Sequence, residues 1–226
     1  MKSELLLKDL ETIGKRIDGF AREIKSAAGN DPRHTVLKIM EIAKALIEQG
    51  KWLRDVMDDE EIVKIADLQL LSFKKYMYVV NSDEGDLQKP SSIDGGFRIC
   101  VKLEEELVSL SDDEQKEYLA ELGQKEPGLN ILIRKAYETL NLASYFTAGP
   151  KEVRAWTIKK GTLAPQAAGV IHGDFERGFI AAEVCNFSDL VEVGGWQAAK
   201  GKGLVKTIGK TEEVKDGMVV EFRFSV

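Results

Sequence analysis

The chain has 226 residues, of which 43% are hydrophobic and 31% charged, and its formal net charge is −6. This composition is typical of a folded globular protein and excludes a disordered chain or a collagen-like fibre. The negative charge disfavours non-specific binding to nucleic acid, so we expect no DNA partner. No run of eighteen apolar residues occurs, so no membrane partner is expected either. Two cysteines, Cys100 and Cys185, make neither a disulfide framework nor a zinc site, which indicates a reducing, cytoplasmic compartment.

The first thirty residues predict a helix with a narrow apolar seam. Asn30 or Asp31 can cap a second helix, with Pro32 in its first turn, and this helix ends at Gly50. Two helices joined by a short polar turn form an antiparallel hairpin. Two interpretations stay open, a structural arm that shields its own seam and a protruding arm that docks on a larger partner. In the first helix the seam residues alternate at steps of four and three, as in a coiled coil: Leu6, Leu10, Ile13, Ile17, Phe20 and Ile24.

The middle of the chain predicts two short strands among helices. Residues 76–80 are a continuous run of β-formers that ends at Asn81, which indicates a buried strand of the kind found in parallel sheets. Residues 97–101 predict a second strand, after a loop rich in Asp, Gly, Pro and Ser. Helices are expected over 59–71, 111–122 and 128–140, and Ser111 with Glu114 can form a capping box.

From Ser144 onward, short β runs alternate with turns that contain glycine, so we place a domain boundary there. The pattern predicts a compact mixed domain with a mostly antiparallel sheet. Thr162 is expected to cap its first helix. The elements expected are strands over 153–158, 179–184 and 219–224, and helices over 164–171 and 196–200.

Residues 209–211, Gly-Lys-Thr, look like the end of a phosphate-binding loop. Such a loop needs a first glycine where Leu204 stands, and a helix after it, whereas an acidic, turn-like segment follows here. We therefore expect an ordinary hairpin turn. A Cys100–His172 catalytic pair would have to form across the domain boundary and is not favoured.

Several segments together resemble the YchF family of Obg-like ATPases. The most specific is 149–180, a strand, a Lys-Lys-Gly turn and a helix, and the segments 145–149 and 216–226 are similar to that family as well. Residues 4–12 resemble the start of the family's helical insert, 119–137 its linking helices, and 78–84 its Asn-x-x-Glu base-recognition motif.

The resemblance implies an α+β fold in three parts. These are an antiparallel helical hairpin (1–72), a partial α/β P-loop-type core with linking helices (73–143), and a C-terminal β-grasp domain of the TGS type (144–226). The phosphate loop, the switch regions and the metal-binding residues would lie before Met1. The chain itself is therefore expected to hold no cofactor and to be inactive alone, whereas the complete family uses ATP with Mg²⁺. The loop over 85–96 is shorter than in the family.

The resemblance also implies two sets of site residues. The first would contact the purine base, although Asn81 is also an ordinary residue to end a strand: Asn81, Ser82, Glu84, Cys100 and Val101. The second would contact RNA or the ribosome, unless this surface packs on the chain's own core: Lys159, Lys160, Arg177, Phe179, Lys200 and Lys202. The C-terminal part is the one expected to meet an acidic partner, because the net negative charge lies in the first 150 residues.

Three function classes remain open. The first is a ribosome- or RNA-associated interaction module related to translation, without hydrolysis of its own. The second is a nucleotide-binding protein that still holds ATP through Asn81 and Glu84, alone or with a partner that supplies the phosphate loop. The third is a scaffold without a ligand. A two-strand remnant of a parallel core also exposes apolar edges, so self-association is expected.

Overall fold

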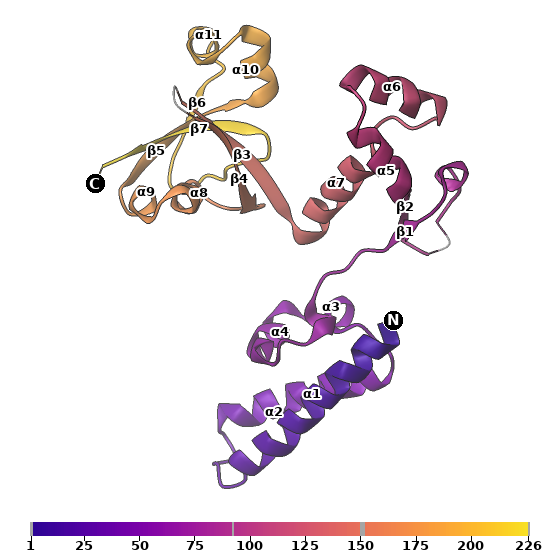
Figure 1. Cartoon of the computed structure of the whole chain (residues 1–226). Coiled ribbons are helices and arrows are strands. Elements are labelled where there is room, and N and C mark those ends of the chain that lie inside the picture. The colour runs from indigo at the N-terminus through magenta and orange to yellow at the C-terminus, as the bar shows by residue number, and fades with distance from the viewer. Residues whose placement is uncertain (1, 92, 150–151, 226) are drawn as a thin grey trace. The chain divides into compact units, whose positions relative to one another are not determined.

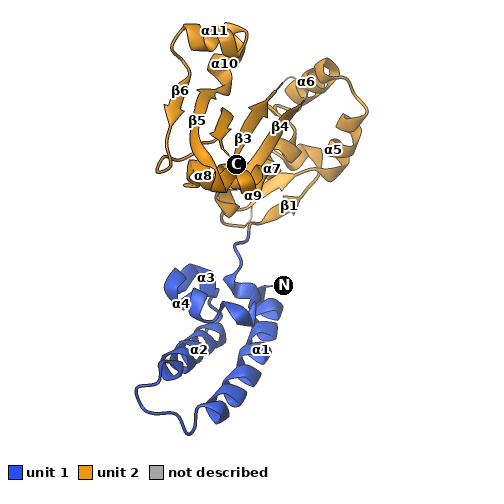
Figure 2. Cartoon of the chain, turned by 90° about the vertical axis from the view of Figure 1, so that its left-hand side faces the viewer, with its two compact units in different colours: residues 1–76 blue, residues 77–226 orange. Residues whose placement is uncertain are grey.

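The computed structural model describes residues 2–91, 93–149 and 152–225. The chain forms two compact units, residues 1–76 and residues 77–226 (Figure 2). The expected domain boundaries after residues 72 and 143 stay a prediction. Among the described residues, no helix has the length and apolar character needed to cross a membrane.

The first unit is built on the predicted hairpin of α1 (Lys2–Glu23) and α2 (Pro32–Glu48) (Figure 1). Asp31 caps α2, because its carboxylate accepts the backbone N–H of Arg33 at 2.9 Å. The two helices lie antiparallel. Of the predicted seam, Leu6, Ile13, Phe20 and Ile24 are buried and Leu10 and Ile17 are partly buried against them, which confirms the pattern in the sequence. Helix α2 contributes Ile39, Met40, Ala43 and Ile47 to the same buried cluster.

Short elements complete the first unit: α3 (Leu53–Val56), α4 (Asp59–Lys64) and two 3₁₀ turns, η1 (Ala66–Leu68) and η2 (Leu71–Phe73). The single helix expected over 59–71 is wrong beyond Lys64. The chain takes a left-handed turn at Gln69, with φ of 49°. The carboxylate of Asp9 on α1 then accepts the backbone N–H groups of Leu71 and Ser72. Tertiary contacts with α1 therefore determine the conformation of this segment.

The second unit begins with two short parallel strands, β1 (Val79–Asn81) and β2 (Phe97–Ile99), with Asn81 opposite Ile99. The predicted strands are present, but each is shorter than expected. The expectation of a buried strand is wrong for β1, because Val79 is 41% exposed and two short strands leave much of its surface open.

The 3₁₀ turn η3 (Glu84–Asp86) lies in the connection between the two strands, and three helices follow β2: α5 (Val101–Val108), α6 (Asp112–Glu121) and α7 (Gly128–Leu140). The capping box is confirmed, since Glu114 accepts the backbone N–H of Ser111 at 2.8 Å. The bounds of α7 agree with the sequence pattern. Helix α5 was not expected, because Val101 was assigned to the preceding strand.

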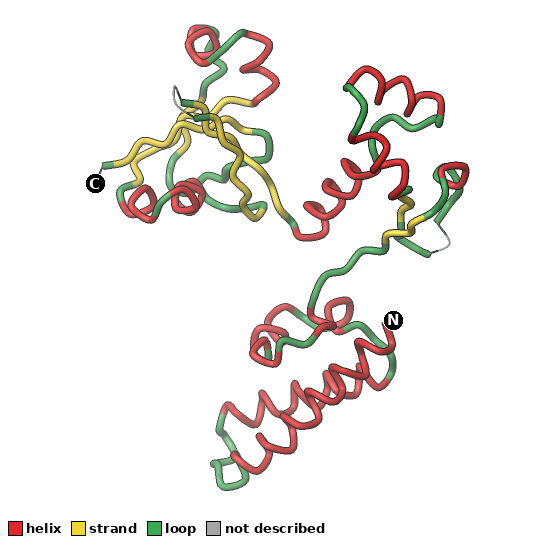
Figure 3. Tube along the Cα trace, in the orientation of Figure 1, coloured by secondary structure: helices red, strands yellow, loops and turns green. Residues whose placement is uncertain are grey.

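A five-stranded sheet forms the rest of the second unit (Figure 3). Its spatial order is β4-β3-β7-β5-β6, and all neighbours are antiparallel except β3 and β7, as the mostly antiparallel prediction requires. The strands are β3 (Leu142–Ala148), β4 (Val153–Lys159), β5 (Phe179–Asn186), β6 (Lys206–Ile208) and β7 (Met218–Phe224). Strands β3 and β6 were not expected.

Helices α8 (Ala164–Ile171) and α9 (Gly173–Arg177) lie on one face of this sheet, and α10 (Phe187–Val193) and α11 (Trp196–Gly201) lie on the other (Figure 1). Three alanines of α8 are fully buried against the strands, which lets the helix approach closely. Helix α8 is confirmed, and α11 nearly so. Thr162 does not cap α8; Leu163 holds that position, and the Thr162 hydroxyl donates to the carbonyl of Lys159 at 2.6 Å.

Candidate functional site

The five residues expected at the base site lie together where β1 and β2 end. Asn81 closes β1, and the backbone N–H of Ser82 donates to the carbonyl of Ile99 at 2.9 Å. Asn81 Oδ1 accepts the backbone N–H of Val101 at 3.1 Å, which ties the end of β1 to the start of α5. In open α/β sheets the carboxyl ends of parallel strands are the usual place for a ligand.

The other members of this corner come from α5 and η3. Cys100 is buried at the N-cap of α5, and its neighbour Val101 is exposed. Lys102 Nζ lies 3.9 Å from a carboxylate oxygen of Glu84, so η3 and α5 face each other. The structure thus brings all five residues to one corner of the sheet.

Tyr118 on α6 extends the corner and was not found from the sequence. Its hydroxyl donates to Glu106 at 3.1 Å. This bond raises the pKa of Tyr118 above its ordinary value, and partial burial and the charge of Glu84 act in the same direction. The tyrosine therefore stays a protonated donor at neutral pH. In the sequence, Tyr118 is a single aromatic residue in a mostly charged helix, and nothing there indicates that its hydroxyl lies at this corner.

The cationic residues expected to contact RNA are not brought together. Lys159 ends β4 opposite Leu142, which begins β3. Phe179, two residues after Arg177, lies opposite Phe224, which ends β7. Since β3 and β7 run parallel, the Lys159–Lys160 pair and Arg177 lie at opposite ends of the sheet. No single basic face joins them.

Lys200 and Lys202 lie apart from both places, on and directly after α11. Lys200 Nζ binds the buried carboxylate of Glu183 at 2.9 Å, and Arg223 binds the same carboxylate. The Lys200 bond, opposed by burial and helped by the charge of Arg223, holds the pKa of Glu183 below its ordinary value. Lys200 therefore has a structural partner.

Two further expectations for the C-terminal domain change with the structure. Phe179 is only 3% exposed and packs edge-on to Phe222 in the core, so the prediction that its ring contacts RNA is wrong. Its ring belongs to the same buried cluster as the alanines of α8. Arg177 pairs with Asp174 on its own helix. Lys159, Lys160 and Lys202 remain exposed and form no ion pair with another described residue.

Metal binding has no evident centre in the part of the chain that the structure describes. No three His, Cys, Asp or Glu side chains there are grouped as ligands for one ion.

Comparison with known proteins gives the class to which this fold and corner belong. A family model for the C-terminal domain of YchF GTPases, described as a protein of unknown function (DUF933), matches residues 142–225. Over 98% of its length the chain also superimposes on 64% of the structure of the Schizosaccharomyces pombe YchF GTPase, with a TM-score of 0.83 and 32% identity.

Curated relatives extend this likeness to the whole chain. It is 41% identical over 239 residues to the ribosome-binding ATPase YchF of Bacillus subtilis, covering 99% of this chain and 64% of that protein. It is 38% identical over 238 residues to the ribosome-binding ATPase YchF of Haemophilus influenzae, covering 100% and 65%. The chain belongs to the YchF family. It spans 64–65% of the length of these relatives.

Proposed function

We propose that the chain is a ribosome- or RNA-associated interaction module of a YchF-type protein, working in the cytoplasm without hydrolysis of its own. The observation that carries the proposal is its likeness, over 99–100% of its length, to relatives named ribosome-binding ATPases. Among the cations expected to contact RNA, Lys159, Lys160 and Lys202 are exposed and form no ion pair with another described residue, so they are free to neutralise phosphates. Because they lie in two places, each place can be tested separately.

Co-sedimentation of the full chain with purified ribosomal subunits, at low and moderate salt, tests this proposal. We expect pelleting at low salt that weakens as salt rises. Reversing Lys159 and Lys160 together, or Lys202 alone, should lower binding and reduce the salt slope by about one for each phosphate that is no longer neutralised. Lys125→Glu is the matched control, because Lys125 is exposed and lies between α6 and α7. Absence of pelleting at low salt would overturn the proposal.

The second candidate is a nucleotide-binding protein, and the corner of β1 and β2 favours it. Asn81 Oδ1 is already occupied by Val101, so its amide N–H₂ remains to donate to a ligand. Glu84 supplies a carboxylate acceptor held only loosely by Lys102, at 3.9 Å. The corner thus offers a base one donor and one acceptor.

This pair of groups favours adenine over guanine. Beside the five-membered ring, adenine presents an acceptor at N7 and a donor at its 6-amino group, whereas guanine presents two acceptors, N7 and O6. The Asn81 amide and the Glu84 carboxylate complement the adenine edge. Guanine would place O6 against the carboxylate, and facing acceptors repel. We therefore expect ATP to bind more tightly than GTP.

Calorimetry of the full chain with MgATP and MgGTP tests this second candidate. We expect saturable heat with millimolar ATP, and a loss of binding in Asn81→Asp. That variant keeps an oxygen acceptor for the Val101 N–H but has no amide donor, so it separates ligand contact from folding. Glu84→Gln should also weaken ATP binding, because it removes the charged acceptor. Glu117→Gln on α6 is its matched control. No heat at millimolar ATP removes this candidate, and no ligand in either assay favours a scaffold.

We also propose self-association of the chain through the region around the small parallel sheet. Apolar side chains are exposed there on β1, α5 and α7, among them Val79, Val101 and Ile133. Sedimentation velocity over a range of concentrations should show a rising sedimentation coefficient. A monomer at every concentration would refute this proposal.

A further inference from the structure

Strand β7 has an open edge. Its ladder with β3 consists of one pair, Phe146 with Val219, and β3 ends two residues later at Ala148. Strand β7 continues for five more residues to Phe224, and along its other edge it pairs with β5 throughout. In the same register Thr147 and Ala148 run beside Val220 and Glu221, so the part of β7 that extends past the end of β3 is residues 222–224, and no described residue pairs with it on that side. These three residues make an edge about 10 Å long at the rise of a strand.

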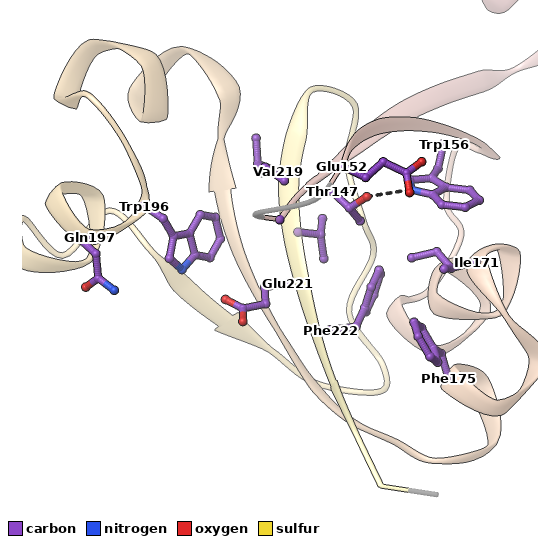
Figure 4. A pocket seen from close by; sticks show the side chains of 13 residues that line it. Thr147, Glu152, Trp156, Ile171, Phe175, Trp196, Gln197, Val219, Glu221 and Phe222 are labelled. Atoms are coloured by element: carbon purple, nitrogen blue, oxygen red, sulfur yellow. Dashed lines mark hydrogen bonds between the residues drawn. The ribbon is translucent and has the colours of Figure 1, made fainter.

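A groove lies along this edge. Its volume is about 770 Å³, within the range of ordinary ligand sites, and residues 219–222 of β7 form its floor (Figure 4). Thr147 and Ala148 of β3 line one side. The space beside the strand is therefore open to an added segment of backbone.

The side chains around the groove are aromatic and acidic. Trp156 is fixed by its indole N–H, which donates to Thr147 Oγ1 at 2.9 Å (Figure 4). Trp196 of α11 lines the groove too, and its buried indole N–H has no partner among the described residues. Glu221 projects from the middle of the strand and forms no ion pair with another described residue. Glu152 lies at the rim, 3.8 Å from Arg154.

These features point to one kind of occupant. On an open strand edge every second residue turns its N–H and C=O outward, and another extended backbone can pair with such a row in place of water. One face of Trp156 already carries the guanidinium of Arg154, 4.2 Å from the ring centroid, so the aromatic side chains favour apolar contacts. The unpaired carboxylate of Glu221 favours cationic side chains on that backbone. The same carboxylates disfavour a nucleic-acid strand.

We propose that the groove binds an extended, basic and apolar peptide segment of another protein, which adds as a strand to the free edge of β7. This is strand addition, in which backbone hydrogen bonds supply affinity and alternate side-chain contacts supply specificity. The peptide site is separate from the corner of β1 and β2.

A synthetic ten-residue peptide of alternating Lys and Val, blocked at both ends, is the probe. It is titrated into the isotope-labelled full chain and followed by NMR amide shifts. We expect saturable shifts centred on residues 222–224. Two further peptides carry N-methyl groups, one on every Val amide and one on every Lys amide. Because one set of amides faces the partner edge, one of these peptides should lose binding while the other keeps it.

Charge reversal of Glu221 supplies the test from the protein side. Glu221→Lys should weaken the Lys-Val peptide at least tenfold, whereas Glu117→Lys, an equal change on α6, should leave it unchanged. Equal binding by both N-methylated peptides would mean contact through charge alone and would overturn the proposal. Absence of shifts at millimolar peptide, or the same shifts with oligouridylate, would also overturn the proposal. Shifts that appear with protein concentration alone would overturn it too, because they would assign the edge to a second copy of the chain.

Discussion

A buried carboxylate on the first helix makes the sharpest test of how the hairpin unit is held. Asp9 is 2% exposed, and its two oxygens accept the backbone N–H groups of Leu71 at 2.8 Å and Ser72 at 2.7 Å. Ser72 is itself fully buried. The carboxylate therefore anchors the turn η2 to α1.

Replacing Asp9 with Ala leaves two buried N–H donors without acceptors. A hydrogen bond to a charged group contributes about 1.5–3 kcal/mol, and two such bonds disappear. Part of this cost is offset, because the carboxylate no longer has to be desolvated. We therefore expect the free energy of unfolding of the first unit to fall by about 2–4 kcal/mol. Asp9→Asn should also lower the free energy of unfolding, because its amide N–H₂ group would face one of the two backbone N–H groups.

Hydrogen exchange of the Leu71 and Ser72 amides measures this effect directly. A decrease of about 2–4 kcal/mol corresponds to exchange faster by roughly thirtyfold to several hundredfold, since about 1.4 kcal/mol is a factor of ten. Asp18→Ala is the control, because Asp18 is exposed on the same helix. If exchange at both amides changes by less than about threefold in Asp9→Ala, the anchoring role is refuted.

Three further changes probe the C-terminal domain. The pKa of Glu183 is depressed in the folded state. The stability that its carboxylate contributes is therefore fully present above the unfolded pKa and is lost as the pH falls through the lower, folded pKa. Below pH about 4.3 the melting temperature of Glu183→Gln should therefore fall less than that of the unchanged chain. Tyr145→Phe removes a buried bond of 2.8 Å to a carbonyl of α8 and should lower stability by about 1 kcal/mol in urea unfolding. Gly178→Ala should lower the melting temperature and loosen the end of β7, because an added Cβ would overlap the carbonyl of Ser225; an unchanged melting temperature would contradict this.

The sequence predicts those elements whose formation depends on local pattern. The seam of α1 and α2 has a helical period, and Asp31 and Pro32 mark where α2 begins, so the hairpin follows from the sequence. The bounds of α7 and α8 follow for the same reason. Only the family resemblance assigned Asn81 and Val101 to one site, and the structure shows a direct hydrogen bond between them.

Other features depend on contacts between distant parts of the chain and leave no local signal. Asp9 stands three residues after Leu6 and four before Ile13, on the buried side of α1, where a charge contradicts the pattern. Its partners lie more than sixty residues away, so only the fold explains it. Strand β6 is three residues long and exists because β5 offers it an edge. Lysine content likewise cannot tell whether cations gather on one face.

The separation of these cations decides how the proposed functions relate to one another. Lys159 and Lys160 lie at the end of β4, beside the start of β3, whereas the open edge of β7 lies beyond the far end of β3. Charge reversal at the two lysines should therefore leave peptide binding unchanged, and Glu221→Lys should not weaken pelleting with ribosomal subunits. If one variant lowers both peptide binding and pelleting, the two assays measure the overall charge of the domain surface. In that case neither the lysine pair nor the strand edge acts as a site by itself.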